Sequence, residues 1–99
     1  VDILRLLRKR GATVKVYDPF VESIDLDSER VTSAKSVETS VDEADCIIIA
    51  TAHKAFAEVD LRKLIRRMHR NPILFDTRNI LLRKTVENAG FRYLGTGRP

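Results

Sequence analysis

A polar constellation that could form a binding site follows one short apolar run of this sequence. Asp76, Thr77, Arg78 and Asn79 come directly after the apolar residues 73–75. An arginine presents a planar pair of donors to a diphosphate, and the backbone amides at the start of a following helix add positive potential. In the structural alternative, Asp76 and Arg78 pair with their neighbours and cap that helix. The position of these residues in the sequence favours neither interpretation over the other.

Other polar residues follow two further segments that resemble strands. Thr51 and His53 come at the end of the apolar run 45–51, and Asp18 follows the alternating segment 13–17. In open α/β sheets, ligands bind beyond the carboxyl ends of the strands, so these positions are binding candidates. Asp18 could accept a ribose hydroxyl, but an aspartate before Pro19 more often forms a turn, and the turn is favoured.

The sequence lacks the common catalytic and metal-binding patterns. No glycine-rich dinucleotide fingerprint follows a first strand, and no phosphate-binding Walker loop is present. The two histidines, His53 and His69, are not spaced as a metal pair with any carboxylate. No serine or cysteine lies at a nucleophile elbow, and no carboxylates are paired at helical spacing for acid and base chemistry. The residues therefore predict a binding domain with no catalytic residue and no metal.

The apolar pattern predicts the elements that position these residues. The run 45–51 is rich in β-branched residues without alternation, which predicts a strand buried on both faces, with Cys46 as a small core residue. Ser40 and Glu43 match a capping box, which predicts a helix beginning at Ser40. Asp60 is expected to cap the helix that follows it. Further strands are expected at 13–17, 73–75 and 91–94, a short one near Val31, and helices at 1–10, 61–70 and 79–89, the last with Leu82, Val86 and Ala89 inward.

This alternation of helices and strands predicts a doubly wound, Rossmann-like α/β fold of three layers with a mostly parallel sheet. Residues 1–99 are expected to form a single domain. In the strand order 3-2-1-4-5-6 the first strand lies between the strands of Val14 and Ile47, and it is expected to be missing from this chain. The Ile47 strand would then have an unpaired edge, which predicts a homo-oligomer.

Composition narrows the classes of function. The chain of 99 residues is 43% apolar and 32% charged, and its formal net charge is +4. No apolar run approaches the length of a membrane span, so no membrane is expected as a partner and the location is expected to be cytoplasmic. Basic residues cluster in 5–10 and 62–70, which leaves a basic interaction module for nucleic acid or a protein as the alternative function. Nucleic acid is disfavoured because no exposed aromatic or recognition motif accompanies the basic clusters.

Five segments of the sequence form a distinctive series: Gly11-Ala12-Thr13-Val14-Lys15-Val16-Tyr17-Asp18-Pro19, Ala44-Asp45-Cys46-Ile47-Ile48-Ile49-Ala50-Thr51, His53 with Phe56, Phe75-Asp76-Thr77-Arg78-Asn79, and Gly90-Phe91 with Tyr93 and Gly95. In order and spacing, this series resembles the carboxyl-terminal, UDP-binding domain of the UDP-glucose/GDP-mannose dehydrogenase family. Relatives that oxidise UDP-glucose usually carry tryptophan at the position of His53. A histidine there resembles the branch that acts on UDP-N-acetylhexosamines, such as UDP-N-acetylmannosamine dehydrogenases.

The resemblance implies an NAD-dependent, two-step oxidation of the primary alcohol of a UDP-sugar to a carboxylate. It also implies that the nucleophilic cysteine and most of the NAD site lie in amino-terminal and central domains outside this chain, so that the chain alone is inactive. By the family pattern Arg78 reaches the diphosphate of the cofactor or of the nucleotide sugar. The same pattern implies nearby positions for Asp18, Thr51, His53 and Asp76.

Overall fold

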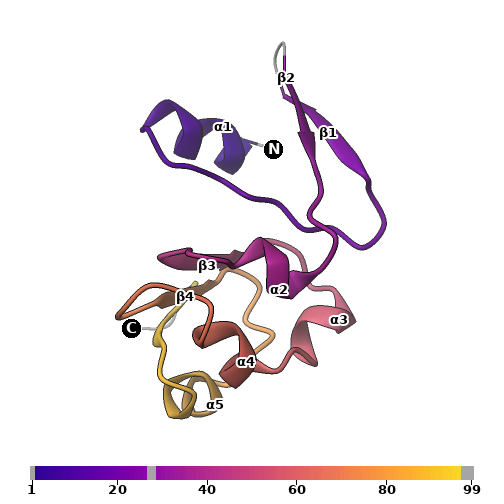
Figure 1. Cartoon of the computed structure of the whole chain (residues 1–99). Coiled ribbons are helices and arrows are strands. Elements are labelled where there is room, and N and C mark those ends of the chain that lie inside the picture. Colours follow the sequence, from indigo (N-terminus) through magenta and orange to yellow (C-terminus); the bar gives the residue numbers. More distant parts are fainter. Residues whose placement is uncertain (1, 27–28, 97–99) are drawn as a thin grey trace. The chain divides into compact units, whose positions relative to one another are not determined.

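The computed structural model describes residues 2–26 and 29–96, and the chain divides into two compact units, Val1–Ser40 and Val41–Pro99. In Figure 1 the colours follow the sequence, from indigo at the N-terminus through magenta and orange to yellow. Among the described residues, no helix has the length and apolarity that crossing a membrane would require.

The first unit begins with helix α1 (Asp2–Lys9), which confirms the helix expected there. Val1, the first residue of the predicted helix, lies outside the described residues. The helix ends at a glycine in the left-handed region, because Gly11 has a φ of 88°. The Ala12 amide donates to the Leu7 carbonyl at 3.0 Å, and the Gly11 amide donates to the Arg8 carbonyl at 3.0 Å. These two bonds form a Schellman motif, in which the last carbonyls of the helix are satisfied.

The expected strand at 13–17 is wrong, because residues 12–18 form no strand. The first unit instead contains an antiparallel pair, β1 (Ser23–Leu26) and β2 (Glu29–Thr32), in a region where the sequence predicted only one short strand near Val31. The extended segment is joined to the end of this pair by the Ala34 amide, which donates to the Val16 carbonyl at 2.7 Å. Alternation of apolar residues predicts an extended chain, but a strand also needs a partner strand, and 12–18 has none among the residues that the structure describes.

The expected capping box at Ser40 is also wrong, by one helical turn. Helix α2 (Val37–Ser40) ends at this residue, and the reciprocal cap lies at its start. The Thr39 amide donates to Ser36 Oγ at 3.1 Å, and the Ser36 amide donates to Thr39 Oγ1 at 3.2 Å. A threonine hydroxyl thus replaces the glutamate that the usual capping pattern contains.

The second unit contains a parallel sheet in the order β3-β4-β5, which consists of β3 (Cys46–Ile49), β4 (Ile73–Asp76) and β5 (Arg92–Gly95). Helices α3 (Lys54–Ala57) and α4 (Leu61–Ile65) connect β3 to β4, and α5 (Arg83–Asn88) connects β4 to β5. Parallel strands joined by crossover helices confirm the Rossmann-like α/β class.

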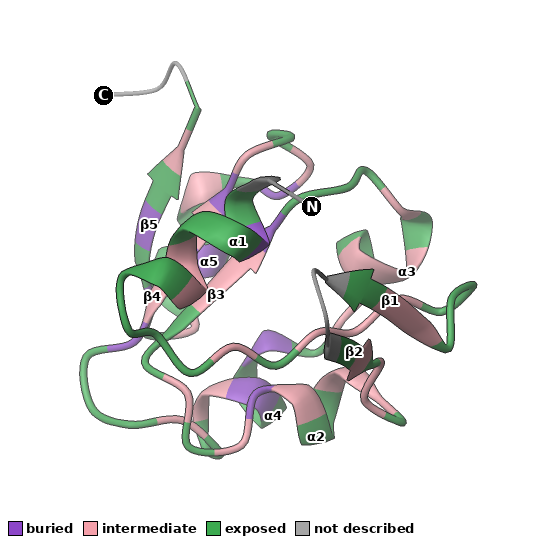
Figure 2. Cartoon of the chain, turned by 90° about the horizontal axis from the view of Figure 1, so that it is seen from above, coloured by how far each residue is buried: buried purple, intermediate pink, exposed green. Residues whose placement is uncertain are grey.

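One face of this sheet forms the core of the second unit. Leu74 and Tyr93 lie opposite each other in the register of β4 and β5, and both are buried. Helices α4 and α5 lie on the same side of the sheet (Figure 1), and their residues Leu64 and Val86 are buried as well. Figure 2 shows these buried positions in purple within α4, α5 and β5.

Strand β3 is less buried than the sequence predicted, because it lies at the edge of the three-stranded sheet. Only Ile49 is buried in it, while Ile47 and Ile48 are half-buried. The prediction that Cys46 is a core residue is wrong, since the residue is exposed. An uninterrupted apolar run indicates a strand, but it does not give the strand's place in the sheet.

Two predicted helices are shorter than expected. Asp60 caps α4 as predicted, accepting the Arg62 amide at 3.1 Å, but the helix ends at Ile65 and the chain turns before Asn71, whose φ is 55°. Helix α5 begins at Arg83 instead of Asn79. Leu82 is therefore outside the helix and 72% exposed, which contradicts its expected inward position, whereas Val86 is fully buried as predicted.

Candidate functional site

The candidate site lies where the three parallel strands of the second unit end. The segment 77–79 follows the middle strand, β4, and its bonds reach both neighbouring strands. Residues 76–79 were singled out from the sequence as one constellation, and the structure shows how each of them is held.

Asp76 is completely buried, and its carboxylate accepts two backbone amides from the loop that follows. Oδ1 accepts the Arg78 amide at 3.2 Å, and Oδ2 accepts the Leu81 amide at 2.7 Å. A buried carboxylate is costly unless it is hydrogen-bonded, and here both oxygens are. This geometry favours a role for Asp76 in fixing the loop over a direct contact with a ligand.

Thr77 and Asn79 attach the loop to the two outer strands. The Thr77 hydroxyl donates to the Ile49 carbonyl at 2.6 Å, and the Thr77 amide donates to the same oxygen at 3.1 Å. Asn79 Nδ2 donates to the Thr96 carbonyl, directly after β5, at 3.1 Å. Both residues belong to the polar segment 76–79 that was singled out from the sequence, but no binding role was assigned to them. The sequence indicated them only as part of a run of polar residues at the end of a strand. The strand to which each side chain is hydrogen-bonded depends on the order of the strands in the sheet.

Arg78 lies between these two attached residues and is exposed. Within residues 2–26 and 29–96, its guanidinium has no hydrogen bond or ion pair, while its amide is held by Asp76. It is therefore a cation on a fixed backbone at the carboxyl edge of the sheet. Such a group can meet an anionic ligand without first breaking a bond within the protein.

Thr51 and His53 follow β3 at the same edge of the sheet. Thr51 is exposed and His53 is half-buried. His53 caps α3, because its Nδ1 accepts the Ala55 amide at 3.0 Å, which in the neutral ring places the proton on Nε2. The rings of His53 and Phe56 have centroids 5.6 Å apart and are tilted by 55°. The structure thus brings Thr51 and His53 to the same sheet edge as Asp76 and Arg78.

Asp18 belongs to the first unit, whereas the other candidates belong to the second. Its Oδ1 accepts the Phe20 amide at 2.9 Å, and its own amide donates to Ser33 Oγ at 2.9 Å. An aspartate that accepts the amide two residues later forms an Asx turn. This geometry favours the turn, which the sequence also favoured.

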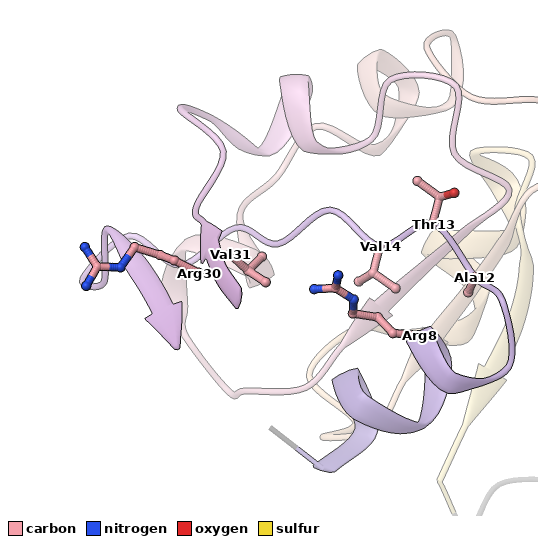
Figure 3. Close-up of a pocket in the computed structure, with 6 residues that line it drawn as sticks. All are labelled: Arg8, Ala12, Thr13, Val14, Arg30 and Val31. Atoms are coloured by element: carbon pink, nitrogen blue, oxygen red, sulfur yellow. The ribbon is translucent and has the colours of Figure 1, made fainter. Parts of the chain in front are cut away.

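A separate pocket of about 410 Å³ lies within the first unit. In Figure 3 the side chains of Arg8 and Val14 extend toward one another, whereas the guanidinium of Arg30 points away from them. Arg30 pairs with Asp25 at 3.2 Å, so the two arginines do not form a joint anion site. The lining residues are Arg8, Ala12, Thr13, Val14, Arg30 and Val31.

No metal is indicated in the part of the chain that the structure describes. There, histidine, cysteine and acidic residues do not gather in groups of three or more that could hold a metal ion. The groups at the site are the guanidinium of an arginine, hydroxyl groups, an imidazole and backbone amides. Groups of this kind bind anions and sugar hydroxyls.

Comparisons with known proteins assign a family to this Rossmann-like domain. Residues 1–83 match the UDP binding domain of the UDP-glucose/GDP-mannose dehydrogenase family. The chain belongs to this family, which confirms the resemblance seen in its sequence. The chain spans about a fifth of the length of the curated relatives it matches.

Three proteins illustrate the similarity. A UDP-glucose 6-dehydrogenase from Rickettsia bellii is 34% identical over 98% of this chain and 23% of its own length. A UDP-N-acetyl-D-mannosamine dehydrogenase from Methanococcus maripaludis is 29% identical over 97% of this chain and 22% of its own length. The crystal structure of an NDP-N-acetyl-D-galactosaminuronic acid dehydrogenase from Methanosarcina mazei Go1 has a TM-score of 0.79 and 28% identity, and it covers 98% of this chain and 20% of that one. These relatives are named for different sugars, so their similarity does not select a branch of the family.

Proposed function

We propose that the chain binds the UDP part of a nucleotide sugar at the carboxyl edge of β3, β4 and β5, with Arg78 as the principal contact to the diphosphate. The family match supports UDP as the ligand class. One structural observation carries the position of the site: Arg78 is exposed and has no partner in the described residues, yet its backbone is fixed by the buried Asp76. Thr51 and His53 are proposed to face the same ligand.

We propose that the whole protein is an NAD-dependent UDP-sugar dehydrogenase that converts a primary alcohol to a carboxylate and contributes to polysaccharide biosynthesis. The residues of this chain fit a diphosphate, but its sequence has no glycine-rich dinucleotide loop, so NAD is proposed to bind mainly to other parts of the protein. The chain alone is expected to form no NADH from NAD and UDP-N-acetylmannosamine. The branch suggested by His53, a homo-oligomeric state and a cytoplasmic location stay predictions.

Isothermal titration of the chain with UDP tests the proposed ligand. UDP should bind with one site per chain, and uridine should bind more weakly because it lacks the diphosphate. A random-sequence oligonucleotide, titrated at low and at moderate salt, tests the alternative of a basic interaction module. Absence of UDP binding, together with oligonucleotide binding that falls steeply with salt, would replace the proposed function by the alternative.

A further inference from the structure

Arg78 lies between two residues whose side chains are bound to different strands. On its amino side, the Thr77 hydroxyl donates to the Ile49 carbonyl of β3 at 2.6 Å. On its carboxyl side, Asn79 Nδ2 donates to the Thr96 carbonyl, directly after β5, at 3.1 Å. Because β4 is the middle strand, the loop that carries Arg78 is attached to both sides of the sheet.

The backbone of Asn79 is suited to this attachment. Its φ of 54° lies in the left-handed region, which is unfavourable for most residues and more accessible to asparagine. Asp76 holds the Arg78 amide on the other side of the loop at 3.2 Å. The loop is thus restrained by a buried carboxylate, by a threonine and by an asparagine. Arg78, which lies between the last two, is exposed.

We propose that Asn79 is a positioning residue, which holds the backbone of Arg78 in its binding conformation by fastening the loop to the end of β5. The identity of the ligand rests on the proposed function, whereas the positioning of Arg78 does not. A guanidinium on a loose loop would lose conformational freedom each time it bound a diphosphate. The attachment to β5 removes the backbone part of that cost in advance.

The chain contains a matched control for Asn79. Asn71 precedes the same strand at its other end, also has a positive φ, 55°, and is exposed. In the described part of the chain its side chain makes no hydrogen bond. Substitutions at Asn71 therefore reproduce the backbone effect of a change at Asn79 without removing an attachment.

The first measurement needs no ligand and uses NMR relaxation of the backbone amides. Asn79→Gly retains access to the left-handed region, and Asn79→Asp retains an asparagine-like backbone but cannot donate to the Thr96 carbonyl. In both variants the order parameter of the Arg78 amide should fall from about 0.85 toward about 0.6. It should not change in Asn71→Gly or Asn71→Asp. An unchanged Arg78 amide in both Asn79 variants would overturn the inference, whether or not UDP binds.

The second measurement is a double-mutant cycle on UDP affinity. Asn79→Gly should raise the Kd for UDP about fivefold, which is the size expected for one neutral hydrogen bond. In an Arg78→Ala background the same change should have almost no effect, because Asn79 acts through Arg78. Equal effects of Asn79→Gly in both backgrounds would show a general structural role and overturn the inference. Absence of UDP binding by the unsubstituted chain would overturn the proposed function, and the relaxation experiment would still decide the role of Asn79.

Discussion

Arg78 is the residue on which the proposed binding depends, and the structure supplies a matched control for it. Arg70 is exposed and precedes β4, whereas Arg78 follows the same strand at its other end. Arg67 lies with Arg70 in the basic cluster 62–70, but it is unsuitable as a control because its guanidinium forms a two-point ion pair with Asp42.

Arg78→Ala should weaken UDP binding by about 10- to 100-fold. The loss of one charge-assisted contact costs about 1.5–3 kcal/mol, and about 1.4 kcal/mol corresponds to a factor of ten in Kd. Arg70→Ala should leave the Kd almost unchanged. Both values can be measured by isothermal titration calorimetry, and equal losses in the two variants would remove Arg78 from the site.

Cys46 should react more slowly in the folded chain than in the unfolded chain. Partial burial of the sulfur raises the pKa of the Cys46 thiol, and the negative charge of Asp45 raises it further. A higher pKa leaves less thiolate at a given pH, and the thiolate is the form that reacts with iodoacetamide. Alkylation at neutral pH should therefore accelerate when urea unfolds the chain. Faster alkylation of the folded chain would contradict the raised pKa.

At the scale of the elements, the sequence predicted features that depend on local bonds. Asp60 caps α4 and Gly11 ends α1 as expected, because both features depend on backbone groups only a few residues away. The extent of the elements was less predictable. Asn79 was expected to begin a helix, but its positive φ belongs to the loop that reaches Thr96, and nothing near Asn79 in the sequence indicates this partner.

The second helix–strand junction of the unit offers a test of packing. Gly90 ends α5 with a φ of 110°, and a Cβ added there would lie 2.7 Å from Ile65 Cδ1. Gly90→Ala should lower the free energy of unfolding by at least about 1–2 kcal/mol, which is the usual cost of the left-handed conformation. Urea unfolding followed by circular dichroism measures this change.

Ile65→Val separates the two parts of that cost. Valine lacks Cδ1, so Gly90→Ala should cost less in the Ile65→Val background than in the original chain. Gly11→Ala provides a further control, since Gly11 has a φ of 88° but no atom within 4 Å of an added Cβ. An equal cost of Gly90→Ala in both backgrounds would show that contact with Ile65 is irrelevant.

At the scale of the whole molecule, the family and the parallel order of the last three strands followed from the sequence. The order β3-β4-β5 was predictable because consecutive strands joined by helices usually lie side by side. The burial of β3 was not predictable, since an apolar run does not show whether its strand is central or at an edge. The candidate site was predictable in part: strand ends identified Arg78, whereas Thr77 and Asn79 depend on which strands are neighbours.

The edge position of β3 leads to a prediction about association. An edge strand with an apolar sequence presents backbone groups that can pair with another chain, and charged side chains oppose such pairing. We expect the chain to sediment as a dimer or larger species and Cys46→Lys to shift it toward the monomer. Cys46→Ser should not, which excludes a disulfide as the cause. A monomer at all concentrations in the original chain would contradict this expectation.

The most direct test of the central claim is to map UDP on the labelled chain by NMR titration. Binding at the carboxyl edge of the sheet predicts shifts of the amides at 51–53, 77–79 and 95–96. The chemical shifts of the amides at 44–45 and 70–71, which precede β3 and β4 at the opposite edge, should not change. Shifts concentrated on the basic residues 62–70, with none at 77–79, would contradict the account.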